Sequence, residues 1–338
     1  MEKLLEVKQL ETSFFTHLGE VKAVRNVSFD INKSEVVGIV GESGSGKSIT
    51  CMSIMKLLQQ SGKIKNGEIL FKGENLITKT PKQMRAIQGN EISMIFQDPM
   101  TALNPVYTIG NQMTEVIRAH KKVSQKEAKD IAINMLKSVG IPSPEQRINN
   151  YPHEFSGGMR QRAIIAMALS CEPELLIADE PTTALDVTIQ AQILDLLKEL
   201  KSKSNTSIIF ITHDLGVIAE LCDRVIVMYG GMIMEETSVI ELFNNPQNPY
   251  TIGLLKSVPN PELTTKQTLI PIAGSPPDML NPPKGCAFCN RCTFAVNRCA
   301  EYIPDIYEIS NGHKVRCHLH SPDAPSHLKA QLGGETHE

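Results

Sequence analysis

The sequence predicts an α/β fold with a mostly parallel sheet, and three apolar runs are the main observation behind this prediction. Residues 36–40, 175–178 and 207–212 are almost entirely apolar, as is typical of strands buried on both faces. Stretches with helical spacing separate these runs, and strands that alternate with helices indicate a parallel sheet covered by helices. A proline-rich change of composition near residue 258 predicts a small, loop-rich C-terminal extension.

The segments around these runs predict two subdomains. Residues 4–10 and 27–31 alternate apolar and polar side chains, which predicts an antiparallel β subdomain. Residues 126–139 and 160–169 are rich in helix formers and predict an inserted helical subdomain over about 100–170. The expected organisation is a core domain over residues 1–257, a C-terminal extension over 258–325 and a polar tail over 326–338.

The composition excludes some classes of partner. The 338 residues carry a net charge of −3 and include no Trp, so neither a basic field nor a stacking platform indicates nucleic acid. No apolar run approaches the roughly 20 residues that span a bilayer. The opening Met-Glu-Lys-Leu-Leu lacks the pattern of a signal peptide. We therefore expect a cytosolic protein that reaches any membrane through a partner.

A phosphate-binding loop follows the first buried run. Residues 41–48 fit the pattern G-x-x-x-x-G-K-[ST], after a predicted strand and before a predicted helix. Backbone N–H groups and the helix N-terminus favour phosphate there, Lys47 is expected to reach the β and γ phosphates, and Ser48 is expected to bind Mg²⁺. The candidate ATP-binding residues of this segment are Gly41, Ser43, Gly44, Ser45, Gly46, Lys47, Ser48 and Ile49.

Two carboxylates end the second buried run. Asp179 follows residues 175–178 directly, and a carboxylate at a strand end near a phosphate loop is suited to hold Mg²⁺ through water. Glu180 comes next and points to the other side of the strand. This position suits a general base that acts on the attacking water.

Further motifs resemble the ABC transporter ATPases, and the resemblance covers residues 1 to about 257. Ser156, Gly157 and Gly158 resemble the signature sequence, which implies binding to an ATP held mainly by another subunit. Because these small residues precede a predicted helix at residues 159–169, they also suit an anion on physical grounds. The other matching positions are Gln97 of the Q-loop, Asp186 of the D-loop in Ala184-Leu185-Asp186, the switch histidine His213 and the adenine-stacking aromatic Phe14.

The resemblance implies a role for each of these residues. Gln97 would contact Mg²⁺ and water, His213 would contact the γ-phosphate, and Asp186 would lie between two composite sites. Phe15 is adjacent to Phe14, so either ring could take the adenine. The catalytic candidates are Glu180, His213 and Gln97, and the implied cofactors are ATP and Mg²⁺.

The subtype follows from three other segments. These segments resemble the peptide and nickel importer branch of the family, and within it the "D"-type ATPase: residues 97–105, 248–251 and 274–277. Asn248 stands where this branch usually has His, which we interpret as a harmless loop change. The resemblance implies an ATPase that powers import of dipeptides or oligopeptides and closes head to tail with a second nucleotide domain.

The implied partners are a sister ABC ATPase in a heterodimer, two transmembrane permease subunits and an extracytoplasmic solute-binding protein, with no nucleic acid. The protein would then lie at the cytoplasmic face of the cell membrane. A nickel importer is the alternative within the family. A soluble ABC ATPase that acts on nucleic acid or ribosomes is the alternative outside transport, although the chain has neither a second fused nucleotide domain nor a long coiled-coil insertion.

Five of the eight cysteines lie between residues 286 and 317. In a reducing cytosol, clustered thiols indicate a metal rather than disulfides. The C-x₂-C-x₂-C spacing of Cys286, Cys289 and Cys292 is familiar from iron–sulfur proteins, and zinc is the competing metal. Free thiols in a small loop-rich domain are the alternative, and His313, His318 and His320 are not expected to be ligands.

The family resemblance implies a [4Fe–4S] cluster on Cys286, Cys292, Cys299 and Cys317. Cys289 is additional to that pattern. A ligand set of Cys286, Cys289 and Cys292 with one later thiol therefore stays open. A regulatory redox or iron-sensing role for this cluster could coexist with transport.

Overall fold

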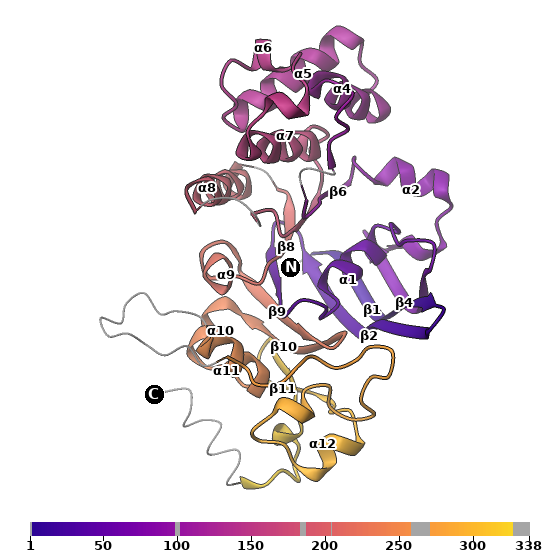
Figure 1. Ribbon diagram of the computed structural model, residues 1–338, viewed down its shortest axis with the longest axis vertical. Coiled ribbons are helices and arrows are strands. Elements are labelled where there is room, and N and C mark those ends of the chain that lie inside the picture. The colour runs from indigo at the N-terminus through magenta and orange to yellow at the C-terminus, as the bar shows by residue number, and fades with distance from the viewer. Residues whose placement is uncertain (1, 99–101, 183–186, 204, 258–270, 327–338) are drawn as a thin grey trace, which may run out of the picture. The chain divides into compact units, whose positions relative to one another are not determined.

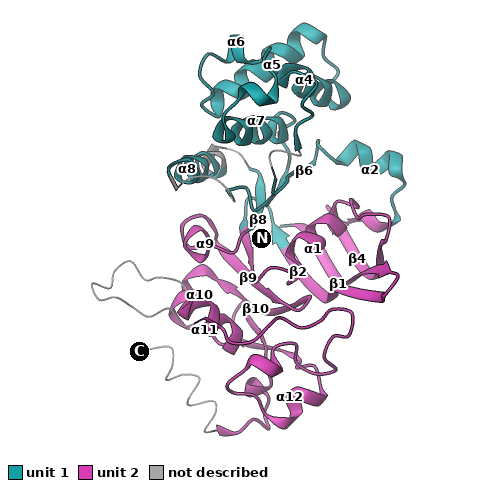
Figure 2. Cartoon of the chain, in the orientation of Figure 1, with its two compact units in different colours: residues 1–3, 31–36, 78–211 teal, residues 4–30, 37–77, 212–338 magenta. Residues whose placement is uncertain are grey.

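The computed structural model describes residues 2–98, 102–182, 187–203, 205–257 and 271–326 (Figure 1). The chain divides into two compact units (Figure 2). Unit 1 comprises residues 1–3, 31–36 and 78–211, and unit 2 comprises residues 4–30, 37–77 and 212–338. Three stretches used in the sequence predictions lie outside the described ranges: residues 99–101 after the Q-loop, residues 184–186 of the D-loop and residues 259–261 of the proline-rich stretch.

Unit 1 contains a parallel sheet of apolar strands. β6 (Ile92–Ile95), β7 (Leu175–Asp179) and β8 (Ser207–Ile211) pair in that order, with Ile95 opposite Ala178. Every residue of the three strands is buried, which explains their continuous apolar sequence. The predicted parallel pairing is therefore confirmed for the two apolar runs of this unit, those that form β7 and β8.

Helices make up most of the rest of unit 1. α5 begins after Ser124, whose side chain accepts from the N–H of Glu127 in a capping box. α7 begins at Gly157, two residues before the predicted start. The helices are α2 (Pro81–Ile87), α4 (Ile109–His120), α5 (Gln125–Ser138), α6 (Pro144–Arg147), α7 (Gly157–Leu169) and α8 (Val187–Lys203), with the 3₁₀ helices η1 (Leu76–Thr78) at the boundary of the unit and η2 (Pro152–Glu154).

The antiparallel sheet has longer strands than the alternation predicts. Its order is β2 (Gly19–Asn32), β1 (Lys3–Thr16), β4 (Gly62–Phe71) and β5 (Glu74–Asn75), and most of it lies in unit 2. Irregular backbone at Gln9 (φ 47°) and Asn26 (φ 50°) breaks the period of two within the strands. For that reason only parts of β1 and β2 carry a regular pattern in the sequence.

Unit 2 also contains a mixed sheet. β3 (Val36–Val40), which ends in this unit, is parallel to β9 (Arg224–Tyr229), and β9, β10 (Met232–Ser238), β12 (His313–Arg316) and β11 (Ile306–Ser310) follow in antiparallel order. The C-terminal region thus supplies two strands besides its loops, and the expected boundary after residue 257 stays a prediction. The helices are α1 (Lys47–Ile54), α9 (Leu215–Leu221), α10 (Val239–Asn244), α11 (Pro249–Lys256) and α12 (Asn297–Glu301), with η3 (Cys289–Arg291) and η4 (His318–His320).

Within the described ranges, the helices are all too short or too polar to cross a bilayer.

Candidate functional site

The phosphate loop of unit 2 connects β3 to α1. Gly41 has φ 146°, and a Cβ there would lie 2.1 Å from the carbonyl oxygen of Met228, so only glycine fits. Lys47 is buried, and its Nζ donates to the carbonyl oxygens of Gly41 (2.7 Å) and Glu42 (3.0 Å). Ser43 and Gly44 are exposed at the tip. The loop therefore presents backbone and hydroxyl groups around a fixed lysine, as a polyphosphate requires.

The candidate general base lies at the end of β7 in unit 1. Asp179 is 2% exposed, and Glu180 follows it in a left-handed conformation with φ 46°. The N–H of Glu180 donates to the carbonyl oxygen of Ile211, and its carboxylate accepts a hydrogen bond from Nε2 of Gln97 at 2.9 Å. A strained backbone is typical of functional positions, where the surrounding structure maintains it. The structure thus brings together two of the three predicted catalytic residues.

The Ser-Gly-Gly element forms the start of α7. Ser156 is the N-cap, and its hydroxyl accepts from the N–H of Met159 at 3.3 Å. Gly157 is exposed with open space at its Cβ position, whereas Gly158 packs against the side chain of Ile189. The first helical turn is therefore open on one side, with N–H groups and the helix dipole available to an anion.

His213 and Phe14 belong to unit 2. His213 is exposed two residues after β8, and the next residue, Asp214, caps α9. Phe14 lies on the same face of β1 as Thr12, whose hydroxyl lies 2.9 Å from that of Ser53 in α1. Phe14 is thus on the face of β1 that is turned toward α1, the helix that begins at the end of the phosphate loop.

Phe15 lies on the other face of β1. Its ring is 42% exposed and lies beneath the ammonium groups of Lys63 (5.6 Å) and Lys65 (5.2 Å). This cation–π environment favours Phe14 over Phe15 for adenine, although both assignments stay predictions. Asp186 lies outside the described residues.

The five clustered thiols line one small cavity in unit 2. The cavity measures about 20 Å³ and is closed by Phe288, Phe294, Leu319 and neighbouring side chains. Cys292 and Cys317 pack against a small apolar cluster of Ile252, Phe294 and Leu319. The five cysteines of the cavity are Cys286, Cys289, Cys292, Cys299 and Cys317, all of them free thiols.

This arrangement is not a formed metal site. Across the described residues, no three His, Cys, Asp or Glu side chains are placed so that they could hold a metal ion. A volume of about 20 Å³ has room for roughly one water-sized probe and for no iron–sulfur cluster. Four or more soft sulfur donors around one cavity nonetheless match the chemistry of iron–sulfur and zinc ligation. The donor set fits a metal, and the cavity would have to widen to hold a cluster.

Burial controls the protonation of these thiols. Desolvation raises the pKa of Cys286 to about 11 and the pKa of Cys292 to about 12, and it also raises the pKa of Cys289 and Cys317. Neighbouring thiols add to the shift, because each disfavours a second negative charge. Without a metal these four thiols are therefore neutral at pH 7, and metal uptake would release the protons of those that become ligands.

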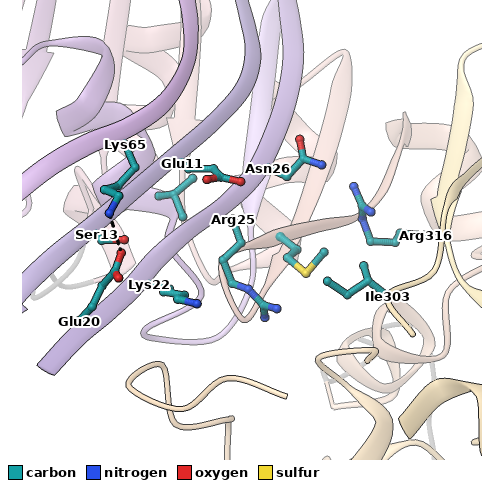
Figure 3. A pocket seen from close by; sticks show the side chains of 11 residues that line it. Glu11, Ser13, Glu20, Lys22, Arg25, Asn26, Lys65, Ile303 and Arg316 are labelled. Atoms are coloured by element: carbon teal, nitrogen blue, oxygen red, sulfur yellow. Dashed lines mark ion pairs between the residues drawn. The ribbon is translucent and has the colours of Figure 1, made fainter. Parts of the chain in front are cut away.

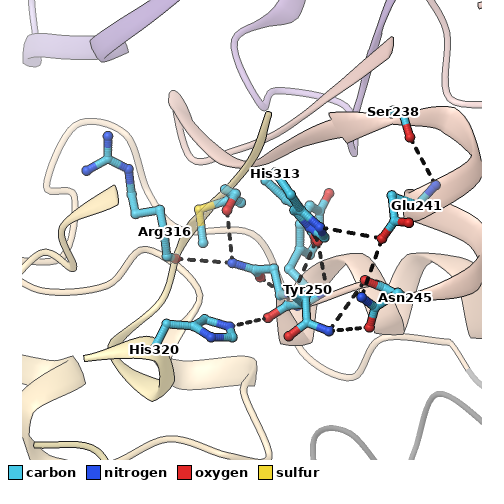
Figure 4. A network of polar contacts seen from close by, with 11 residues as sticks. Ser238, Glu241, Asn245, Tyr250, His313, Arg316 and His320 are labelled. Carbon is cyan, nitrogen blue, oxygen red and sulfur yellow. Dashed lines mark hydrogen bonds and ion pairs between the residues drawn. The ribbon is translucent and has the colours of Figure 1, made fainter. Parts of the chain in front are cut away.

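The nearby histidines have protein partners. Nε2 of His313 lies 2.7 Å from Oε1 of buried Glu235. Nε2 of His318 lies 2.9 Å from the carbonyl oxygen of Tyr302, and Nε2 of His320 lies 2.9 Å from that of Gln247. The rings of His313 and His320 link the C-terminal segment to β10 and to the residue before Asn248 (Figure 4), whereas His318 contacts Tyr302 within the segment.

Asn248 is more buried than a change in a loop suggests. It is 1% exposed, and its side chain caps α11 by accepting from the N–H of Tyr250. Its Nδ2 donates to the carbonyl oxygens of Met234 (3.2 Å) and Arg316 (3.1 Å). The residue thus lies directly before α11 and is a buried link between β10, α11 and β12, and the interpretation as a harmless change stays a prediction. A one-residue departure from a motif carries no signal of this burial.

A second cavity of about 500 Å³ lies between the antiparallel sheet and the C-terminal segment of unit 2 (Figure 3). Lys22, Arg25, Lys65 and Arg316 line it together with Glu11 and Glu20, and Lys65 pairs with Glu20 at 3.6 Å. Ser13 also lines this cavity, so by strand alternation Phe14 points away from it.

Comparison with protein families gives two matches along the chain. A family model described as "ABC transporter" matches residues 24–183. A second model, described as "Oligopeptide/dipeptide transporter, C-terminal region", matches residues 234–299. The second match covers four of the five clustered cysteines and the buried Asn248.

Similar proteins extend over nearly the whole chain. The oligopeptide transport ATP-binding protein OppD of Bacillus subtilis (strain 168) is 55% identical over 324 residues, which cover 96% of this chain and 90% of that protein. The dipeptide transport ATP-binding protein DppD of the same strain is 54% identical over 320 residues, with 94% and 95% covered. Among solved structures, the dimeric ATP-binding cassette MJ0796 bound to ADP and Pi gives a TM-score of 0.63 at 27% identity, covering 70% of this chain and 98% of that one.

Proposed function

The chain belongs to the oligopeptide and dipeptide branch of the ABC transporter ATP-binding proteins, and from this membership we propose that it hydrolyses ATP to drive a peptide importer. The observation that carries hydrolysis is the position of Glu180, held in a strained turn at the end of β7 with Gln97 on its carboxylate. The relatives named for peptide transport support the cargo.

We propose a division of labour among the predicted site residues. Lys47 and the loop N–H groups bind the β and γ phosphates, and Ser48, Gln97 and Asp179 are the residues that would hold Mg²⁺. Mg²⁺ supplies charge neutralisation on the phosphates when bound. Glu180 accepts a proton from the water that attacks the γ-phosphorus, while Gln97 orients the carboxylate and His213 contacts the γ-phosphate. The bond from that phosphorus to the leaving ADP oxygen breaks as the water oxygen bonds.

The open N-terminus of α7 supports a site shared between two subunits. Ser156 and Gly157 are exposed, and in this proposal they bind the γ-phosphate of an ATP held by another chain. The similar cassette MJ0796 is dimeric, which agrees with this arrangement. We propose a sister ATPase as the partner. The other partners proposed are two permease subunits and a solute-binding protein, with this chain peripheral at the cytoplasmic face of the membrane.

Reconstitution tests the proposed function. The chain would be co-purified with its membrane subunits, placed in proteoliposomes and supplied with the solute-binding protein loaded with a peptide library or with Ni²⁺. ATP-dependent peptide uptake, abolished by Lys47→Ala, is the expected result. Nickel uptake without peptide uptake would overturn the cargo, and recovery of a homodimer of this chain in the complex would overturn the sister ATPase.

For the C-terminal thiols we propose a [4Fe–4S] cluster on Cys286, Cys292, Cys299 and Cys317, with Cys289 as an additional candidate and zinc as the competing metal. Such a cluster supplies a cross-link and a one-electron couple when bound. The five thiols around one cavity support the proposal. Protein purified without oxygen should be brown and contain iron and sulfide. It should lose both in Cys292→Ser and keep them in Cys289→Ser. Colourless protein with zinc would contradict the cluster.

A further inference from the structure

The cysteine loop, residues 286–292, contacts the phosphate loop through one arginine. Arg291 lies in η3 between Cys289 and Cys292, and its side chain is only 5% exposed. Its Nη1 lies 2.6 Å from Oε2 of Glu42 and its Nη2 lies 2.9 Å from Oε1. Glu42 is the second residue of the phosphate loop, so a two-pronged ion pair joins the two segments.

The arginine is fixed on every side. Besides Glu42, its Nη1 donates to the hydroxyl of Tyr229 (3.0 Å), its Nη2 to the carbonyl oxygen of Ile272 (3.0 Å) and its Nε to that of Ala273 (2.9 Å). These acceptors account for all five N–H donors of the guanidinium. A lysine has neither the number nor the planar arrangement of donors to replace it.

A second contact reaches the same residue of the phosphate loop. Phe288, also in the cysteine loop, packs edge-on against the ring of Tyr229 (5.3 Å between centroids) and at 5.2 Å from the ring of Tyr250. The hydroxyl of Tyr250 accepts a hydrogen bond from the N–H of Glu42 at 2.9 Å. The backbone and the carboxylate of Glu42 are thus both held by groups that contact the cysteine loop.

The position of Glu42 affects the phosphate-binding lysine. Nζ of Lys47 donates to the carbonyl oxygen of Glu42 at 3.0 Å and to that of Gly41 at 2.7 Å. A shift of the Glu42 peptide would therefore move an acceptor of Lys47 and change the loop that receives the phosphates. Two successive contacts therefore connect the cysteine loop to the lysine: Arg291 with Glu42, and Glu42 with Lys47.

We propose that Arg291 is a positioning residue for ATP, which holds the phosphate loop through Glu42 and couples nucleotide affinity to the conformation of the cysteine loop. The inference rests on the proposed function, since it takes the loop to bind ATP. Coupling between two sites is reciprocal. ATP must therefore shift the conformational equilibrium of the cysteine loop by the same factor by which that conformation changes ATP affinity.

The test measures binding of a fluorescent ATP analogue and ATPase kinetics on the full chain. Arg291→Met should raise Kd and KM about tenfold, the range of a charge-assisted pair, with kcat at saturating ATP within about twofold. Glu42→Gln should do the same, and the double variant should be no weaker than either single one. Arg291→Lys should recover only part of the loss. The matched control is Arg298→Met, an exposed arginine of the same segment that pairs with Asp323 at 3.7 Å.

A thiol measurement separates positioning from a merely structural role. ATP should slow the reaction of a small disulfide reagent with the clustered thiols, and this effect should vanish in Arg291→Met and Glu42→Gln but persist in Arg298→Met. Unchanged ATP affinity in Glu42→Gln, or thiol rates that do not respond to ATP in the parent, would overturn the inference. Failure of the parent chain to bind the analogue would instead overturn the proposed function.

Discussion

The phosphate loop and the cysteine segment, residues 285–317, are built in opposite ways. The phosphate loop lies between a fully buried strand and a helix, and apart from the side-chain contacts at Glu42 its backbone sets its shape. The cysteine segment consists of loops, one 3₁₀ helix, one five-residue helix and the short strands β11 and β12, and around the thiols its shape depends on side-chain contacts. A site made by the backbone is specified locally, whereas a site made by side chains requires the whole segment to fold.

Each region nonetheless depends on one glycine that contacts a carbonyl group. A Cβ on Gly41 would lie 2.1 Å from the oxygen of Met228, and a Cβ on Gly285 would lie 2.2 Å from the oxygen of Cys299. Gly41 belongs to a known motif, while Gly285 precedes the first clustered cysteine without any motif. The two glycines are therefore equally intolerant of a side chain. The two regions differ in whether a recognisable sequence motif marks the glycine.

Glu180→Gln has the largest expected effect, and this effect should be confined to ATP hydrolysis. Loss of the general base should lower kcat by roughly 10²–10⁴-fold while ATP binding is retained, because the amide keeps the shape but accepts no proton. Single-turnover hydrolysis and analogue binding measure the two effects. The cysteine segment should keep its metal content and thermal stability. Unchanged turnover would remove Glu180 from the mechanism.

Gly285→Ala should break the cysteine side. The added methyl group would overlap the backbone of Cys299 and Ala300, so we expect a loss on the order of 2–4 kcal/mol in the free energy of unfolding. Gly312→Ala is the control, because open space surrounds its Cβ position and only its φ of 77° costs about 1 kcal/mol. Urea unfolding of both variants measures the two losses in free energy of unfolding. Equal losses would mean that the close contact at Gly285 is not limiting.

Phe14→Ala and Phe15→Ala distinguish the two faces of β1. Stacking of a base on an aromatic ring contributes about 1–3 kcal/mol, so removal of Phe14 should weaken ATP binding roughly 5- to 100-fold. Removal of Phe15, whose ring lies under two lysines, should change it less than about twofold. Titration with the fluorescent ATP analogue measures both. The reverse ranking would assign adenine to Phe15.

The last expected effect, smallest near neutral pH, is a pH dependence that comes from the cysteine thiols. The folded pKa values of Cys286 (about 11) and Cys292 (about 12) lie above an unfolded value of about 8.5. Burial of the neutral thiols therefore stabilises the metal-free protein below about pH 8.5, and this stability is lost as the pH rises toward the folded pKa values. We expect a loss of about 1 kcal/mol per thiol for each pH unit above that point.

Urea unfolding of metal-free protein at neutral and alkaline pH measures this loss. A Cys286→Ala/Cys292→Ala variant should show a flatter dependence on pH. An equally steep dependence in that variant would assign the effect to other groups.

The predictability of each region from the sequence follows from the same contrast. The buried strands and the loop between β3 and α1 are continuous in sequence, so their patterns are complete within a few residues. β11 and β12 carry weak local patterns, because β12 is fixed by pairing with β10, far away in the chain. The pair of Arg291 and Glu42 joins residues 249 positions apart, and neither residue type indicates its partner. Asn248 could not be recognised as buried for the same reason.

The pairing of β12 with β10 has a consequence for the C-terminal region as a whole. β12 satisfies the backbone of β10 at Glu235 and Glu236, next to a buried pair of Glu235 with His313. A chain that ended at residue 257 would expose these N–H and C=O groups along a strand edge, and Glu235 would lose its histidine. Exposed edges of this kind recruit strands from other molecules. The C-terminal region therefore covers this edge of β10, independently of any metal, and the sheet ends instead at the short strand β11.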